Sequence, residues 1–403
     1  MLRKVSSHGI GYSIADLSQV RYIFASAVPR VDGDLYEQAH DALSTIESVI
    51  CGQVCGGGCI VRQAVFLRDP AEYETCKQII GEFYGDDLPA TSYVVQPPCG
   101  GKLVEIEAWG VCRNGGDLAV ERVSEHLVIV RHSGITSAHC AGIVPRIDDD
   151  AVYHRSFNAF QRMRDALLSH GFRYEQIIRT WLYLGDIVGV QDGVERYREL
   201  NRARSDFYEG LCFSNRHVPP SVNGTVYPAS TGIGASDRDV LMGCLALETD
   251  RDDIAFLPLE NPQQTSAFDY GKQHGTSSPK FSRAMAVITG DTAVVLISGT
   301  ASIVNAETRH IGDVEAQTHQ TLDNIQKLIA APNFARYGFH GLGATLDDMA
   351  LVRVYIKRRE DYERTRAICE ARLGELPTMY AVADVCRPDL LVEIEGVAFA
   401  HGA

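Results

Sequence analysis

The pentapeptide LVEIE occurs twice in the chain, at 103–107 and at 391–395, and each copy carries two glutamates two positions apart. Residues two apart in a strand point to the same side, so Glu393 and Glu395 would share one face. Glu393 is flanked by leucine, valine and isoleucine, and apolar surroundings raise the pKa of a carboxyl group by desolvation. A carboxyl group held partly neutral in this way could act as a general acid, and Glu395 on the same face could support it or hold a water. An ordinary carboxylate at a solvent edge is the alternative, which the apolar strand disfavours.

An apolar run with arginine in second position precedes each copy. These runs are VRQAVFLRDP from Val61 and VRVYIKRRED from Val352, and a third version is IRTWLYLGDI from Ile178. The nearly equal spacing from Arg62 and from Arg353 to the following LVEIE indicates that the two copies keep one register. The middle copy ends in VLMGCLALET, which lacks the carboxylate pair, so acid chemistry at this strand is restricted to the other two copies.

Each copy alternates strand, long helix, strand, shorter helix and strand, which predicts an α+β fold with helices on one face of a mixed sheet. In the last copy, residues 312–330 should form the long helix, with acidic residues at its N-terminus. The predicted repeats cover 1–118, 119–252 and 253–403. Residues 250–280, rich in Pro, Gly, Ser and Gln, would be a linker or an active-site loop.

Composition narrows the class of protein. Of the 403 residues, 45% are apolar and 22% charged, which is ordinary for a globular chain. The net charge of −14 argues against nucleic acid as a partner. No long apolar stretch predicts a membrane span or a secretory signal, so a cytoplasmic location is expected.

The 11 cysteines are expected to be reduced thiols. The run CGQVCGGGC, Cys51 to Cys59, does not have the spacing of a zinc or iron–sulfur site, and a glycine-rich helix exit explains it better. No nucleotide, flavin or zinc-protease motif is present, so we expect chemistry without a cofactor or metal.

Two families resemble parts of this sequence. The strings SGTAS (298–302), AQTHQTLDNI (316–325) and LVEIEGVA (391–398) resemble the RidA/YjgF family of trimeric proteins, which have clefts between subunits. The strings PASTGIGA (228–235), PKFSRA (279–284), HIGDVEAQ (310–317) and CRPDLLVEIEG (386–396) resemble the chorismatase family. The resemblance implies a pseudo-trimer of three RidA/YjgF-like α/β repeats within one chain. It also implies an active cleft between the second and third repeats, a diverged and non-catalytic first repeat, and a monomer or weak dimer.

Chorismatases remove pyruvate from chorismate, a dicarboxylate with an enol ether. The resemblance implies that Glu393 protonates the enolpyruvyl group and that arginines hold the carboxylates. Candidate cations are Arg179, Arg283, Arg353 and Lys357, any of which could instead form a surface ion pair. Candidate polar residues around the substrate are Tyr183, Thr231, Ser298, Thr300, Gln317 and Tyr355. Gly232 and Gly234 would let the TGIG backbone approach closely or offer amides to a carboxylate.

Two positions bear on the product. Family members that add water tend to carry alanine where this chain has Gly299 and Cys386, and members that form 3-hydroxybenzoate resemble this chain. The resemblance therefore implies that Cys386 assists opening of an arene-oxide-like intermediate, although a small buried cysteine is a common structural residue. Hydrolysis to a dihydroxycyclohexadienoate, a RidA-like imine or enamine hydrolase and a non-catalytic binding protein remain alternatives.

Overall fold

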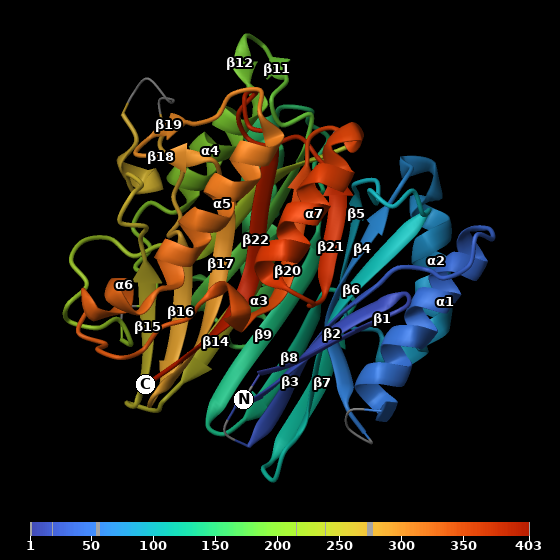
Figure 1. Cartoon of the computed structure of the whole chain (residues 1–403), viewed down its shortest axis with the longest axis horizontal. Helices are drawn as coiled ribbons and strands as arrows, with labels where there is room; N and C mark the ends of the chain where they lie inside the picture. Colours follow the sequence, from blue (N-terminus) through green and yellow to red (C-terminus); the bar gives the residue numbers. More distant parts are fainter. Residues whose placement is uncertain are drawn as a thin grey trace.

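The computed structural model contains three six-stranded sheets with helices on their outer faces (Figure 1). It describes residues 2–17, 19–53, 57–214, 216–237, 239–271 and 277–402. The predicted α+β class is confirmed. Within these ranges, no helix is long and apolar enough to cross a membrane.

The first sheet lies in residues 2–113, next to helices α1 (Leu35–Glu47) and α2 (Tyr73–Tyr84). In spatial order its strands are β1 (Leu2–Ser7), β2 (Ile10–Leu17), β3 (Val20–Ala27), β6 (Val104–Arg113), β4 (Cys59–Leu67) and β5 (Ala90–Val95). Helix α1 begins at a capping box, in which Asp34 and Glu37 accept each other's backbone N–H.

The second sheet lies in residues 118–249 and packs with helices α3 (Val152–Leu168) and α4 (Arg196–Phe207). Its spatial order is β7 (Leu118–Ser124), β8 (Leu127–His132), β9 (Ile135–Ile143), β14 (Val240–Thr249), β10 (Ile177–Gly185) and β13 (Ala229–Ala235). A small hairpin, β11 (Val190–Gln191) and β12 (Val194–Glu195), precedes α4.

The third sheet lies in residues 254–401 and is covered by α5 (Val314–Ile329), α6 (Ala331–Ala335) and α7 (Tyr362–Leu373). Its spatial order is β15 (Ile254–Leu259), β16 (Ala284–Thr289), β17 (Thr292–Ala301), β22 (Val392–His401), β20 (Met349–Ile356) and β21 (Thr378–Val382). A second small hairpin joins β18 (Ile303–Val304) to β19 (Glu307–Thr308). The predicted helix at 312–330 is α5, and Asp313 caps it by accepting the N–H of Ala316.

The predicted loop at 250–280 is wrong over its first part. The segment IAFLPL, which contains Pro258, forms strand β15 at the edge of the third sheet. An edge strand tolerates proline because one side of its backbone needs no partner in the sheet.

The three sheets share one strand order. When the six long strands of each sheet are numbered along the chain, their spatial order is 1-2-3-6-4-5 in every case. Strands 4 and 5 pair in parallel in each sheet, and the other pairs are antiparallel. One strand order in three successive stretches of chain is what the repeated sequence pattern predicts.

One pairing irregularity occurs at the same point of each sheet. The register between the fourth and sixth strands shifts just before Arg62, Arg179 and Leu351. Arg62 and Arg179 are therefore equivalent, whereas Arg353 lies two positions further along, opposite Glu395. The expected common register of Arg62 and Arg353 is wrong, because the third sheet has its arginine one pleat later on the same face.

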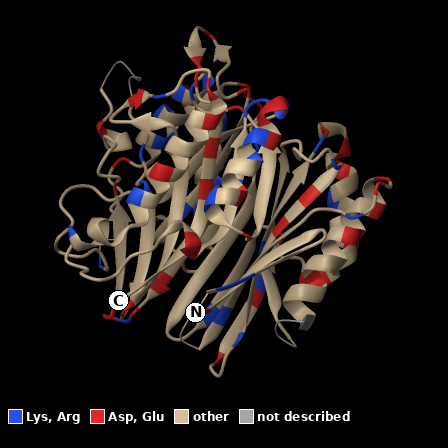
Figure 2. Cartoon of the chain, in the orientation of Figure 1, with Lys and Arg blue, Asp and Glu red and all other residues tan. Residues whose placement is uncertain are grey.

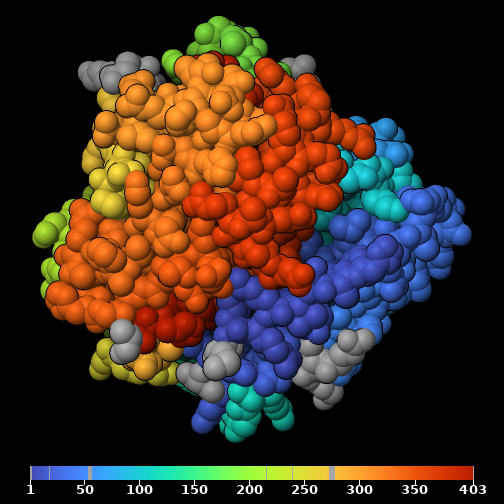
Figure 3. All heavy atoms as spheres, in the orientation of Figure 1, coloured from blue at the N-terminus to red at the C-terminus, as the bar shows by residue number. Residues whose placement is uncertain are grey.

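The inner faces of the sheets meet in one apolar core. Phe24 of the first sheet lies 6.1 Å, ring to ring, from Phe399 of the third, and Trp109 lies 6.0 Å from Trp181 of the second. Figure 3 shows the first part of the chain, in blue, packed directly against the last part, in red. The three parts thus bury a shared centre, where the clefts between them begin.

The cysteine run at 51–59 is described in part. Residues 48–53 form a π-helical turn and Cys59 begins β4, whereas Cys55 lies outside the described residues. In the ranges that the structure describes, no group of three His, Cys, Asp or Glu side chains could hold a metal ion.

Candidate functional site

A cavity of about 340 Å³ lies between the second and third sheets. The second part of the chain contributes side chains from α4 and β13, and the third part contributes β17, β22 and the approaches to β16 and β22. The lining residues used below are Tyr197, Arg204, Ser230, Gly232, Tyr270, Arg283, Gly299, Cys386, Arg387 and Glu393. Five of them were predicted from the sequence: Gly232, Arg283, Gly299, Cys386 and Glu393.

Glu393 is the most deeply buried of the acidic residues in the cavity wall, which also include Glu195, Glu307 and Asp389. Its side chain is 4% exposed, and no described residue donates a hydrogen bond to its carboxyl group. Burial, and then the charge of Glu395, raise the pKa of Glu393 to about 8. The carboxyl group is therefore mostly protonated near pH 7, in the form that a general acid requires.

Glycine at position 299 leaves the space that this carboxyl group occupies. A Cβ atom at Gly299 would lie 2.1 Å from Oε1 of Glu393 and 3.1 Å from the methyl carbon of Thr231. Any larger residue at 299 must displace the acid or itself. The identity of residue 299 is thus coupled to the position of the Glu393 carboxyl group.

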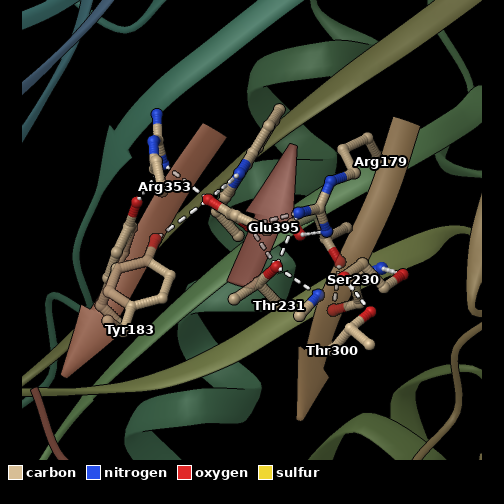
Figure 4. A network of polar contacts seen from close by, with 12 residues as sticks. Arg179, Tyr183, Ser230, Thr231, Thr300, Arg353 and Glu395 are labelled. Carbon is tan, nitrogen blue, oxygen red and sulfur yellow. Dashed lines mark hydrogen bonds and ion pairs between the residues drawn. The ribbon is translucent and has the colours of Figure 1, made fainter. Parts of the chain in front are cut away.

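Glu395, two residues further along β22, lies in a different environment (Figure 4). Five donors reach its two oxygens: Arg179 and Thr231 on Oε2, and Tyr355 (2.9 Å), Arg353 (3.0 Å) and Trp181 (3.2 Å) on Oε1. Burial alone would raise the pKa of Glu395, but the two arginines and the hydroxyl donors outweigh it and lower the pKa. Glu395 is an ionised anchor that lies outside the cavity lining.

The two glutamates therefore have opposite protonation states although they share one strand face. Glu393 has no hydrogen-bond donor among the residues that the structure describes and keeps its proton, whereas the charge of Glu395 is balanced by fixed cations. Neighbouring carboxyl groups with pKa values that are pushed apart are typical of an acid–base site.

Arg179 and Arg353, both predicted to bind substrate, bind glutamates instead. Arg353 donates two bonds to Glu107, from Nε to Oε2 (2.6 Å) and from Nη2 to Oε1 (2.7 Å), besides its bond to Glu395. Arg179 bonds Glu395 and lies over the ring of Trp181. Neither arginine lines the cavity.

These contacts follow a cyclic pattern among the three parts of the chain. The second part's Arg179 reaches Glu395 in the third, and the third part's Arg353 reaches Glu107 in the first. The first part's Arg62 reaches the second part, where it donates to the carbonyls of Cys140 and Cys244. Its Nη2 atom lies 3.1 Å from the point that a Cβ atom on Gly243 would occupy. Gly243 stands where the other two sheets have Glu107 and Glu395.

Four arginines line the cavity, Arg198, Arg204, Arg283 and Arg387. Arg283 donates from Nη2 to the hydroxyl of Tyr270 (2.5 Å) and to the carbonyl of Thr265 (3.2 Å). Arg387 donates from Nη1 to the carbonyl of Ala306 (2.8 Å). For Arg204 and Arg283, the buried Nε has no partner among the described residues. Arg204 and Arg283 thus each keep one N–H donor without a described protein partner.

The sequence held a signal for part of this set. Tyr197, Asn201 and Arg204 are spaced i, i+4 and i+7, so they share one face of α4, and all three line the cavity. Arg387, by contrast, is recognisable only when the approach to β22 is seen to border the cavity.

The other predicted polar residues support the walls. Gln317 fixes the approach to β22, because its side chain donates to Asp389 O (2.8 Å) and accepts the N–H of Leu391 (2.8 Å). Lys357 pairs with Asp384 (3.2 Å). The remaining contacts are Ser298 to Ser230 N–H (2.8 Å), Thr300 to Ser298 O (3.0 Å), Tyr183 to Arg353 (2.9 Å), Thr231 to the N–H of Gly299 (2.9 Å), and Gly234 N–H to Asp384 O (2.8 Å).

Cys386 faces the same cavity as Glu393. Its burial, and then the charge of Glu393, raise the pKa of the thiol to about 12. The thiol is therefore protonated at neutral pH, which suits a hydrogen-bond or proton donor better than a thiolate nucleophile.

Glu105 is the first sheet's counterpart of Glu393 and has a similar environment. It is 4% exposed, and burial raises its pKa to about 8, although Ser26 lies within hydrogen-bond distance. It does not line the cavity described above. The elevated pKa is thus shared by both LVEIE strands.

The free energy of unfolding of Glu105→Gln is expected to increase relative to that of the wild type as the pH rises. In the folded chain Glu105 holds its proton up to about pH 8, whereas the unfolded chain loses it near the ordinary glutamate pKa, so the wild type's free energy of unfolding falls between these pH values. Glutamine does not titrate. Urea denaturation at about pH 5 and about pH 8.5 should show a relative gain of a few kcal/mol. If the free energy of unfolding changed equally with pH in both proteins, the buried carboxyl group of Glu105 would not be protonated as described.

Comparison with known proteins gives two family models and several relatives. The model described as "Chorismatase FkbO/Hyg5-like, N-terminal" matches residues 116–246, and "Endoribonuclease L-PSP" matches residues 275–400. A 3-hydroxybenzoate synthase of Streptomyces hygroscopicus is 35% identical over 279 residues, covering 66% of this chain and 76% of the relative. A chorismatase of Streptomyces rapamycinicus is 36% identical over 229 residues, covering 56% and 64%.

A solved structure shows the same fold. The crystal structure of a chorismatase at 1.08 Å resolution has a TM-score of 0.66 and 23% identity, and the match covers 95% of this chain and 100% of that one. The resemblance inferred from the sequence motifs is confirmed by these matches.

Proposed function

This chain belongs to the chorismatase family of enzymes, and we propose that it converts chorismate to 3-hydroxybenzoate and pyruvate, with Glu393 as the general acid. The observation that carries the proposal is the contrast between Glu393, which is protonated in the cavity wall, and Glu395, which is ionised behind it. A proton donor held next to a network of arginines suits the cleavage of an anionic enol ether.

The reaction begins with proton transfer from Glu393 to the methylene carbon of the enolpyruvyl group. This makes the enol ether carbon an oxocarbenium and weakens the bond from the ring carbon to the ether oxygen. The neighbouring ring hydroxyl displaces that oxygen, pyruvate leaves, and the hydroxyl proton restores the acid. The resulting epoxide opens to the phenol, with the ring hydrogen lost as a proton. No water is consumed, so the atoms of chorismate equal those of the two products.

Arg204, Arg283 and Arg387 are the groups that we expect to hold the two carboxylates of the substrate. They come from α4, from the residue before β16 and from the approach to β22, so they approach the cavity from different elements. Guanidinium groups bind carboxylates with paired N–H donors and keep their charge when buried. This set replaces Arg179 and Arg353 in the substrate-binding role.

Cys386 and Gly299 are proposed to set the product. The protonated thiol would donate to the epoxide oxygen as it opens, and the missing side chain at Gly299 leaves Glu393 its present position. Hydrolysis to a dihydroxycyclohexadienoate is the competing outcome, since water and the internal hydroxyl would attack the same activated ring carbon.

Incubation of the wild type with chorismate in heavy-oxygen water is expected to give unlabelled 3-hydroxybenzoate and an equal amount of pyruvate. Cys386→Ala should lower the share of 3-hydroxybenzoate, and Cys386→Ala with Gly299→Ala should lower it further. A change of about 1.4 kcal/mol between competing barriers alters the product ratio about tenfold. Chromatography with mass detection measures both products. Label in the ring hydroxyl would favour hydrolysis, and unchanged ratios would remove the two residues from the product choice.

We also propose that residues 1–118, 119–252 and 253–403 are three RidA/YjgF-like units that form a pseudo-trimer. The common strand order and the cyclic arginine contacts support this arrangement. A chain that forms all three clefts internally should be a monomer or a weak dimer. Light scattering at micromolar concentration tests this, and an obligate homotrimer would contradict it.

A further inference from the structure

The three parts of the chain form clefts that can be compared residue by residue. In each sheet, the fourth strand (β4, β10 or β20) pairs with the sixth strand on one side and with the fifth strand on the other. The residue of interest in the fifth strand lies opposite the fourth-strand residue that is two positions before the last pair with the sixth strand. These residues are Tyr93 opposite Val65, Gly232 opposite Leu182, and Tyr380 opposite Val354. In all three sheets, the fourth-strand residue two positions after Val65, Leu182 or Val354 pairs with the first residue of the sixth strand, which is β6, β14 or β22. Tyr93, Gly232 and Tyr380 therefore occupy one equivalent position.

A tyrosine on the following helix faces this position in every part. Tyr73 begins α2 and its ring lies 5.7 Å from that of Tyr93. Tyr362 begins α7 and its ring lies 5.4 Å from that of Tyr380. Two of the three clefts thus contain a pair of packed tyrosine rings. Between the third and first parts, Tyr380 lines a cavity of about 760 Å³ that Glu105 does not line.

Tyr197, the second residue of α4, is the helix tyrosine of the remaining cleft. It faces Gly232, whose Cβ would lie 3.0 Å from Cε2 of the ring. Both Tyr197 and Gly232 line the 340 Å³ cavity. The cavity therefore lies where the second tyrosine of the pair is missing.

The cleft between the third and first parts repeats two features of the cavity, although Cys369 stands where the cavity has Arg204. Val382 N–H donates to the carbonyl of Pro97 (2.8 Å), two residues before Cys99, and Gly234 N–H donates to that of Asp384 (2.8 Å), two residues before Cys386. Both clefts then contain a cysteine and a buried glutamate with raised pKa values, the buried Cys99 with Glu105 and the half-buried Cys386 with Glu393.

The acid and the thiol therefore do not distinguish the two clefts, but the occupant of the equivalent position does. We infer that the residue at position 232, like its counterpart Tyr380, decides whether the buried glutamate of a cleft can meet a ring-shaped substrate: glycine opens the way to Glu393, and Tyr380 separates Glu105 from the cavity of the equivalent cleft. The inference rests on the proposed function for the identity of the substrate, but the opening and closing of each cleft is a separate, structural claim.

Gly232→Tyr tests the closing. Its crystal structure should show the new ring packed on Tyr197 inside the cavity, and pyruvate release from chorismate should fall about 100-fold or more. The activity of Gly232→Ala should lie between those of the wild type and Gly232→Tyr, because the alanine methyl group meets only the edge of the Tyr197 ring. A new ring that turns away and leaves the cavity open, or full activity in Gly232→Tyr, would overturn the inference. If this variant does not fold, Gly232→Leu carries the same test.

Tyr380→Gly tests the opening, with Tyr93→Gly as the matched control. The crystal structure of Tyr380→Gly should show a new cavity lined by Tyr362 and Glu105, whereas the cavity of Tyr93→Gly should contain no glutamate, because Leu241 occupies the equivalent place. A closed cleft in Tyr380→Gly would overturn the inference. If the wild type releases no pyruvate from chorismate, the proposed function fails, and the crystal structures still decide which residue opens each cleft.

Discussion

Glu393→Gln is expected to lower the kcat for pyruvate release by about 10²–10⁴-fold, while the affinity for substrate stays within a few fold of the wild type. Glutamine has the same shape as the protonated acid but has no proton to give to the methylene carbon. The loss should therefore fall on turnover. A lactate dehydrogenase assay for pyruvate and calorimetric titration of the ligand measure the two quantities.

Glu105→Gln is the matched control for this experiment. Glu105 occupies the same position in the first LVEIE strand and has the same raised pKa, but it lies outside the cavity. Its variant should keep wild-type activity. The wild type should also lose activity as the pH rises through about 8, because the reactive form of Glu393 is the protonated one. Substantial pyruvate release by Glu393→Gln would assign the proton to another group.

Arg353→Met is expected to reduce the free energy of unfolding by about 3–5 kcal/mol. Arg353 bonds two buried glutamates at once, and its loss leaves Glu107 without its cation and Glu395 with Arg179 alone. Removing one partner of a buried ion pair strands a charge that water cannot reach. Urea denaturation near neutral pH measures the loss.

Arg62→Met is the control for this second prediction. Arg62 is equally buried but has carbonyl acceptors and the ring of Trp181, at 3.9 Å, in place of a carboxylate. Burial lowers the pKa of Arg62 to about 10, and its Nε has no partner among the described residues. Its removal should cost clearly less than that of Arg353. Equal losses would mean that packing, not the ion pairs, stabilises this centre.

The sequence predicted the strands and helices that carry the site better than it predicted the site's cations. The duplicated LVEIE strand and its flanking runs identified the acid strand, since side-chain alternation is a local property. The arginines were harder. A buried arginine that binds a glutamate and one that lines a cavity look alike in sequence, because the difference depends on which sheets meet and in which register.

The pairing irregularity before Arg179 and Leu351 illustrates this limit. Measured from it, the third sheet's arginine lies two residues later than that of the second, so similar sequence runs do not place their charges at equivalent positions. The net charge was similarly uninformative about the cavity. Along the ribbon in Figure 2, Lys and Arg residues are interspersed with Asp and Glu residues.

The common strand order also affects how such a protein changes over time. In a trimer of identical subunits, each substitution appears at three places, so a change that improves one cleft and harms another cannot be kept in one alone. Here the three equivalent positions are encoded separately, as Tyr93, Gly232 and Tyr380. One part can therefore lose a side chain and admit a ligand, while the other two keep their tyrosines and their packing. The difference between one reactive cleft and two supporting clefts is then encoded in a single gene.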